Sequence, residues 1–166
     1  MFVNPRQHKA CIWSGYGHIP VKMSSMEKLG VRDCNCGAMR KAMRRMSSFY
    51  DAQLAPSGLR ATQFAILATL NEMGEVSINR MAEQMALDRT TAGKNLRPLE
   101  KAGLIKVAPS ASDGRMRVIT LSREGYNALK KAVPLWRAAQ KSFEKWNGAE
   151  NAATLRSTLQ GLRLES

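Results

Sequence analysis

The sequence of 166 residues contains no long uninterrupted apolar run. A membrane-spanning helix needs about 20 consecutive, mainly apolar residues, whereas the longest apolar neighbourhood, residues 64–70, has polar neighbours on both sides. The hydrophobic fraction of 44% is nonetheless sufficient for a packed core. We therefore expect a soluble, folded protein with no membrane partner.

Cysteine and histidine are scarce as well. The three cysteines, Cys11, Cys34 and Cys36, are odd in number and two of them are one residue apart, which does not fit a secreted disulfide framework. The two histidines, His8 and His18, lie near the N-terminus, so a zinc site would lack ligands. We expect a protein of the reducing cytoplasm with no metal and no cofactor.

Signatures of catalysis are also missing. The sequence contains no glycine-rich phosphate loop, no Gly-x-Ser-x-Gly elbow and no histidine beyond residue 18 that could serve as a general base. An enzyme is therefore a poor fit to this sequence.

Acidic residues are outnumbered two to one by basic residues. Lys and Arg number 26 against 13 Asp and Glu, which gives a formal net charge of +13. Such an excess favours a polyanionic partner, because each neutralised phosphate releases condensed counterions. A basic surface that only maintains solubility and an anionic membrane surface are alternatives, so the positions of the charges must decide.

Residues 1–30 show neither helical nor strand periodicity. Two interpretations are open for this segment: a disordered tail, or a start codon placed too far upstream of Met23 or Met26. Helical periodicity follows in residues 35–54 and 62–73, and again after Ser122.

Residues 77–107 are the most informative stretch. Ser77 is a natural N-cap for a short helix, and Asp88 for a second one, residues 89–102. The apolar residues Ala92, Leu96 and Leu99 of the second helix are spaced by four and three, which places them on one inward face. Two short helices joined by a tight turn predict a helix-turn-helix.

A β-hairpin is predicted directly after these helices. Residues 104–107 and 116–121 have strand character, and the loop between them contains a proline, Asp113 and Gly114. A hairpin in this position is the wing of a winged helix. The predicted fold class is thus mainly α with a small β-hairpin wing, flanked by N- and C-terminal dimerisation helices.

The second helix and the hairpin carry the residues expected to bind DNA. When its aliphatic residues face the core, the helix directs outward or sideways a set that combines phosphate ligands with side chains able to bond base edges: Arg89, Thr90, Thr91, Lys94, Asn95 and Arg97. The hairpin adds Arg115 and Arg117, and an arginine at a loop tip can enter the narrow minor groove. The alternative is a winged helix that only binds proteins, for which an apolar or acidic helix would be expected.

The sequence resembles the MarR family of bacterial regulators from about residue 34 to residue 162. The resemblance lies in the order and spacing of six short segments: GLRATQF (58–64), LDRTT (87–91), NLRPLE (95–100), GLI (103–105), DGR (113–115) and ITLSREG (119–125). It implies a homodimer joined by its terminal helices, with winged-helix lobes that bind palindromic operators. It also implies a repressor that a small ligand or an oxidant releases from DNA.

The terminal helices agree with this implication, because a compact winged helix cannot cover their apolar faces. We predict a dimerisation helix in residues 31–56, a DNA-binding domain in residues 57–121 and further dimerisation helices in residues 122–166. Half-sites about one helical turn apart, roughly 10 base pairs, would suit such a dimer.

Two regulatory sites are suggested by the resemblance. Cys36 has a spacing from Gln63 similar to that of the reactive cysteine in the organic-hydroperoxide-responsive branch, and Tyr50 falls where one of that branch's activating tyrosines lies. The alternative is that Cys34 and Cys36 are inert residues buried at a dimer interface.

An apolar cavity for a small aromatic effector is the second suggested site. Its candidate lining residues are Met39, Met43, Phe49, Tyr50 and Trp136. Aromatic and methionine side chains at helical spacing are also what an ordinary core contains, so both interpretations stay open.

Overall fold

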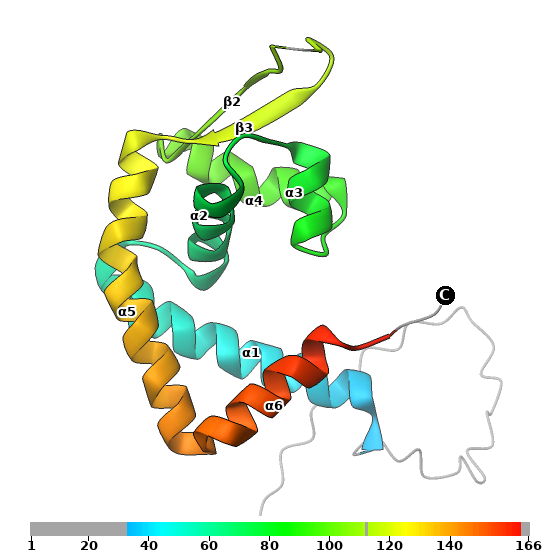
Figure 1. Ribbon diagram of the computed structural model, residues 1–166, viewed down its shortest axis with the longest axis vertical. Helices are drawn as coiled ribbons and strands as arrows, with labels where there is room; N and C mark the ends of the chain where they lie inside the picture. Colours follow the sequence, from blue (N-terminus) through cyan, green and yellow to red (C-terminus); the bar gives the residue numbers. More distant parts are fainter. Residues whose placement is uncertain (1–32, 112, 164–166) are drawn as a thin grey trace, which may run out of the picture.

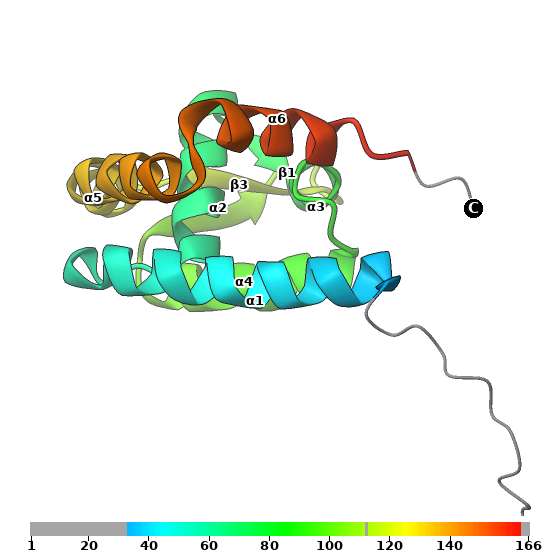
Figure 2. The ribbon, with the colours of Figure 1, turned by 90° about the horizontal axis from the view of Figure 1, so that it is seen from below.

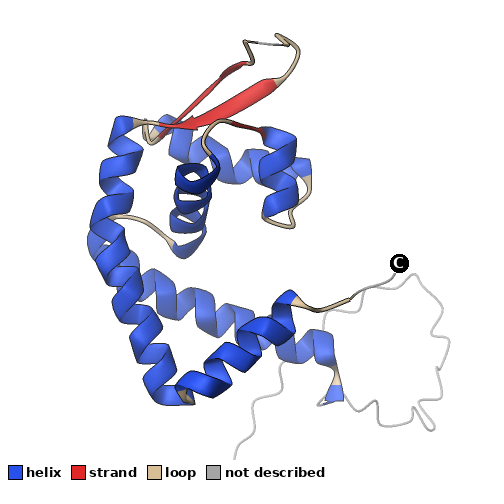
Figure 3. Cartoon of the chain, viewed as in Figure 1, coloured by secondary structure: helices blue, strands red, loops and turns tan. Residues whose placement is uncertain are grey.

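The computed structural model describes residues 33–111 and 113–163, and the predictions for residues 1–30 lie outside these ranges. Helices make up most of the described chain, and one small sheet lies at one end (Figures 1 and 3). The elements are α1 (Asn35–Leu54), the 3-10 helix η2 (Ala55–Ser57), α2 (Ala61–Met73), β1 (Val76–Ser77), α3 (Ile78–Gln84), α4 (Arg89–Lys101), β2 (Ile105–Pro109), β3 (Arg117–Leu121), α5 (Arg123–Asn147) and α6 (Ala149–Gln160). No helix within the described ranges is long and apolar enough to cross a membrane.

The helix-turn-helix is present as predicted. The Ser77 hydroxyl accepts a hydrogen bond from the backbone N–H of Arg80 at 3.1 Å and so caps α3. The turn between α3 and α4 contains Ala86, whose φ of +50° is uncommon for a residue with a Cβ. The cap at Ser77 and the tight turn between the two helices were both expected from the sequence.

The wing belongs to a three-stranded antiparallel sheet with the order β1-β3-β2. The hairpin of β2 and β3 was predicted, whereas β1 was not, because two residues carry no periodicity. Val76 pairs with Ile119, and Ser77 with Val118. β2 extends to Pro109, which was predicted to lie in the loop. A proline is tolerated there because β2 is an edge strand and its missing N–H interrupts no second ladder.

The hydrophobic core joins these elements into one unit. Its largest fully buried side chains are Leu54, Ile66, Leu67, Leu70, Met81, Leu99, Ile105 and Ile119. They come from the end of α1, from α2, α3 and α4, and from two strands. Each Å² of buried apolar surface contributes about 25 cal/mol to stability. Because the same core contains Leu99 of α4 and Ile105 and Ile119 of the wing strands, it holds α4 in a fixed position relative to the wing.

Helix α5 leaves this unit and forms an open frame with α1 and α6, on the side away from the sheet (Figures 1 and 2). We call α1, α5 and α6 the helical stem. The Ser122 hydroxyl begins α5 by accepting from the N–H of Gly125 at 2.9 Å, and it donates to the Gly103 carbonyl at 2.6 Å. A Cβ on Gly125 would lie 2.0 Å from the Leu104 carbonyl oxygen, so α5 packs directly against the segment that follows α4.

The stem is only partly packed within one chain. Leu54 is the one buried residue of α1, and Ala152 the one buried residue of α6. Large apolar side chains are exposed on α1, at the end of α5 and on or just after α6: Met39, Met43, Trp146, Leu155, Leu159 and Leu162.

Candidate nucleic-acid interface

Helix α4 is held by an apolar underside and an N-terminal cap. Ala92, Leu96 and Leu99 are buried as predicted, with exposures of 0–3%. One carboxylate oxygen of Asp88 accepts from the backbone N–H of Thr91 at 2.9 Å, and the other accepts from the Thr91 hydroxyl at 2.6 Å. The side-chain bond from Thr91, helped by its backbone bond, holds the pKa of Asp88 below its ordinary value. Asp88 therefore stays ionised and occupied with its own helix.

The outer face of α4 is polar and basic. Thr90, Lys94 and Arg97 are exposed and recur at the spacing of four and three residues that aligns them on one side of a helix. Asn95 lies at the edge of this face and is half-buried. No acidic residue of α4 precedes Glu100, so the first three turns of the helix present positive charge and hydroxyl groups to solvent.

The structure gives the residues predicted to bind DNA different roles. Thr91 is half-buried and its hydroxyl donates to Asp88, so it first serves the cap. Arg89, the first residue of α4, is exposed on the side of the helix that faces the wing, where it shares a small cavity with Arg115 and Arg117. Lys101, in the last turn, is a further exposed cation, which was not among the residues predicted to bind DNA.

The wing is a short hairpin with an ordered turn. The carboxylate of Asp113 accepts from the N–H of Arg115 at 2.9 Å, and its carbonyl accepts from the N–H of Met116 at 2.9 Å. Arg115 thus lies in the turn itself. Arg117 begins β3 and donates through Nη2 to the Val107 carbonyl at 3.4 Å. The two arginines are therefore held differently, one by its backbone in the turn and one by its side chain across the hairpin.

The candidate redox residues lie far apart within one chain. Cys34 caps α1 by accepting from the N–H of Gly37 at 3.4 Å, and Cys36 follows in the first turn; both are exposed free thiols. Tyr50 lies near the other end of α1, about four helical turns or roughly 21 Å from Cys36. The two side chains cannot meet in one subunit. No cluster of three or more potential metal ligands occurs among residues 33–111 and 113–163.

Tyr50 is part of a polar group on the stem. Its hydroxyl donates to Oε1 of Gln140. Burial raises the pKa of Tyr50 above its ordinary value; the positive charge of Arg156 opposes this shift, and Glu144 adds to it. Gln140, Glu144 and Arg156 also line an open cavity of about 520 Å³ between α5 and α6.

The candidate effector residues are distributed over several contacts. Trp136 stacks on Phe64 with ring centroids 5.6 Å apart, and it borders the cavity between α5 and α6. Phe49 packs edge-on against Trp146 at 5.2 Å. Met39 and Met43 are exposed on α1. Of the candidate effector residues, Trp136 therefore borders a cavity, whereas Met39 and Met43 lie on an exposed face of α1.

Comparisons with known proteins agree with this geometry. The family model "MarR family" matches residues 59–116. The HTH-type transcriptional repressor NicR of Pseudomonas putida is 25% identical over 118 residues, which are 70% of this chain and 75% of that protein. The organic hydroperoxide resistance transcriptional regulator of Bacillus subtilis is 29% identical over 100 residues, 60% of this chain and 68% of that protein.

A solved structure provides the fullest match of these. The M. tuberculosis transcriptional regulator MosR, in complex with DNA, is 34% identical and superimposes with a TM-score of 0.66. The alignment covers 80% of this chain and all of that one (100%). Together with the helix-turn-helix, the wing and the basic outer face of α4, these matches show that the chain belongs to the MarR family and is a winged-helix, DNA-binding transcriptional regulator.

Proposed function

We propose that this regulator is a repressor that binds a palindromic operator as a homodimer, with α4 of each subunit in the major groove and the wing in the flanking minor groove. The observation that carries the proposal is the outer face of α4, where Thr90, Lys94 and Arg97 are exposed above a fully buried apolar underside. A helix presented in this way can enter the major groove without disturbing the core.

The side chains divide into two roles in this proposal. Lys94 and Arg97 neutralise backbone phosphates, and Asn95 and Thr90 contact base edges. Arg115 enters the minor groove from the turn of the wing. Thr91 contributes mainly by holding Asp88 at the cap, although its hydroxyl oxygen can still accept a hydrogen bond.

The helical stem supports the homodimer. Its exposed apolar side chains include Trp146, Leu155 and Leu159, which face solvent in a single chain. A second copy of the stem would cover them at a self-complementary interface. The proposed units are a dimerisation helix in residues 31–56, the DNA-binding domain in residues 57–121 and dimerisation helices in residues 122–166.

Repression by such a dimer would be reversible. The relatives include a repressor and an organic hydroperoxide resistance regulator. In this chain the open cavity bordered by Trp136 is the candidate site for a small aromatic effector, and the exposed thiol of Cys36 is the candidate target of an oxidant. Cys36 is exposed at the start of α1 and could meet Tyr50 only across the dimer. A protein that binds operator DNA in this way works in the cytoplasm and needs no catalytic activity.

Selection of bound duplexes from a random DNA pool, followed by salt-dependent shift assays, tests the proposal. We expect Lys94→Ala to weaken binding to all duplexes and to flatten the salt dependence by about one phosphate contact. Asn95→Ala should instead relax the sequence preference. Binding that does not respond to salt, or equal loss of preference in both variants, would contradict the proposal.

Release by oxidant needs its own measurement. Treating the protein–duplex complex with an organic hydroperoxide should lower the affinity of the wild type and leave Cys36→Ser bound. Equal release of both proteins would exclude Cys36 as the sensor.

A further inference from the structure

A small cavity lies between the start of α3, the start of α4 and the wing, and we call it the wing notch. Its volume is about 100 Å³, several times what a single water molecule requires. Three segments that are distant in sequence line it: Ser77, Ile78 and Asn79 from β1 and α3, Arg89 from α4, and Arg115, Met116 and Arg117 from the wing.

The short strand β1 creates the wing notch. Pairing of Ser77 with Val118 places the first residues of α3 beside Arg117 of β3. Arg89 is the first residue of α4, directly after the Asp88 cap and the turn that follows α3. Its side chain lines the wing notch together with Arg117. The notch therefore exists only where the sheet and both helices of the helix-turn-helix meet.

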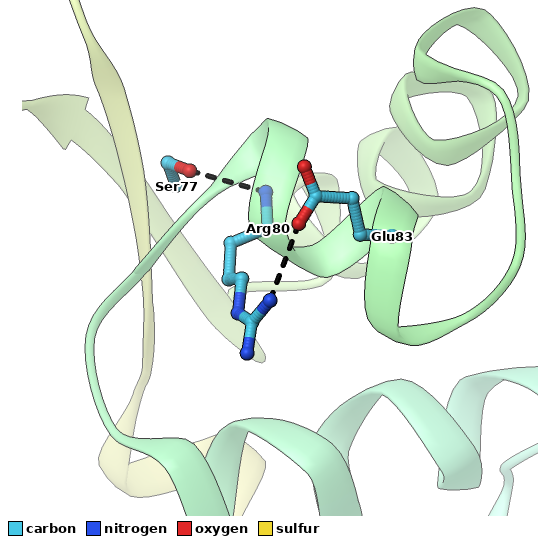
Figure 4. A network of polar contacts seen from close by, with 3 residues as sticks. All are labelled: Ser77, Arg80 and Glu83. Atoms are coloured by element: carbon cyan, nitrogen blue, oxygen red, sulfur yellow. Dashed lines mark hydrogen bonds and ion pairs between the residues drawn. The ribbon is translucent and has the colours of Figure 1, made fainter.

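The lining is strongly basic. Three of its seven residues are arginines and none is a carboxylate. The nearby acids are already engaged: both oxygens of Asp88 accept from Thr91, and the Asp113 carboxylate accepts from the backbone N–H of Arg115. Glu83 forms an ion pair with Arg80 at 3.3 Å, and Figure 4 shows Arg80 directed toward Glu83. Arg80 is not part of the lining, so the positive charge of the notch belongs to Arg89, Arg115 and Arg117.

The side chain of Arg117 is held in place by a hydrogen bond within the hairpin. Its Nη2 donates to the Val107 carbonyl, which restrains the guanidinium across the hairpin. A guanidinium has five N–H donors in a planar fork, so most of them stay available. Asn79 is an exposed residue of the same lining and offers a side-chain amide that can donate without adding charge.

We propose that the wing notch binds one phosphate of the DNA backbone, with Arg89 and Arg117 as charged ligands and the Asn79 amide as a neutral donor. The inference rests on the proposed function: the major groove and its neighbouring minor groove are separated by a single sugar–phosphate strand. A protein with α4 in one groove and the wing in the other must straddle that strand. The notch lies between these two elements and so faces the strand, and Arg115 is left to enter the minor groove.

The experiment uses a duplex that the full-length protein selects from a random pool. Single phosphates in that duplex are replaced, one at a time, by neutral methylphosphonates, and affinity is measured for wild type, Asn79→Ala and Arg117→Gln. Arg44→Gln is the matched control, because it removes the same charge from α1, at the opposite end of the structure from the sheet (Figure 1).

We expect one phosphate in each half-site, between the segments contacted by α4 and by the wing, at which neutralisation weakens wild-type binding about tenfold. The same replacement should weaken Asn79→Ala and Arg117→Gln less than it weakens wild type, because each variant has already lost one of the three ligands of that phosphate. Arg117→Gln should also reduce the slope of log affinity against log salt by about 0.9, whereas Asn79→Ala, which removes no charge, and Arg44→Gln should leave it unchanged.

The proposal is overturned if the duplex is selected and bound but all four proteins give the same methylphosphonate pattern. It is also overturned if Arg117→Gln changes affinity without losing sensitivity to any one phosphate, because Arg117 would then bind elsewhere on the DNA. Failure to select any duplex would instead reject the proposed function itself, which keeps the two failures distinct.

Discussion

The winged-helix region, residues 61–121, and the outer helices of the stem, α1 and α6, bury their apolar residues to very different extents. In the winged-helix region Leu67, Leu99 and Ile119 are fully covered by neighbours from the same chain. On α1 and α6, Met43 is 67% exposed and Leu155 is 47% exposed. The two regions have similar kinds of apolar side chain, so the difference lies in what covers them.

This contrast indicates which interactions each region depends on. The winged-helix region closes its own core and can hold α4 and the wing in place within one chain. The outer stem helices leave apolar faces that gain from a second subunit, since burying a leucine side chain contributes about 1.5–3 kcal/mol. α5 connects the two regions, because Ser122 and Gly125 tie its first turn to the segment after α4.

The largest effect is expected from a substitution in the core of the winged-helix region. Leu99→Ala removes a fully buried side chain and should lower the free energy of unfolding by about 2–5 kcal/mol, measured by urea denaturation at fixed protein concentration. The dimer dissociation constant should change little. Leu155→Ala should instead change the free energy of unfolding little and raise the dimer dissociation constant about tenfold, as measured by sedimentation. If Leu155→Ala left dimerisation intact, the contrast between the two regions would be wrong.

The next effect concerns the connection between the regions. Gly125→Ala places a Cβ 2.0 Å from the Leu104 carbonyl oxygen, a backbone atom that cannot turn away, and should destabilise the protein by about 1–3 kcal/mol. Gly93→Ala on α4 is the matched control, because its Cβ would meet no atom within 4 Å. That variant should gain up to about 1 kcal/mol from helix propensity. Equal stability of the two variants in thermal or urea unfolding would rule out the close packing of α5.

The smallest effect tests the cap of α4. The hydrogen bonds from Thr91 hold the pKa of Asp88 below its ordinary value, so the ionised cap stabilises the folded protein above that value, about 3.9. The stabilisation should be lost as the pH falls from there through the lower pKa of the folded state. Asp88→Asn keeps an N-cap residue without an ionisable group. Its melting temperature should therefore fall less than that of wild type over this acidic range, and parallel curves would contradict the assignment.

Much of the architecture was predictable because it depends on local signals. The helix of residues 35–54 has the bounds expected from its periodicity, and Ser77 and Asp88 cap helices as predicted. The inward set of α4 also followed from spacing alone. Capping and helical periodicity act within a few residues, so they can be recognised without knowledge of the rest of the chain.

The candidate site was predictable only in part. The sequence identified the basic residues of the wing and those of α4 except Lys101, but not that Thr91 is used by the cap or that Arg89 faces the wing. It also placed Cys36 and Tyr50 in one hypothesis, although a single helix keeps them roughly 21 Å apart. Their functional meeting would need a second subunit.

Periodicity, capping residues and net charge alone determined that this chain forms a basic helix-turn-helix with a hairpin wing. The tertiary structure decided which charges act together. The two-residue strand β1 brings Asn79 to Arg117, and the absence of a side chain on Gly125 lets α5 approach Leu104. Such features arise from contacts between residues far apart in the chain, and no local propensity encodes those contacts.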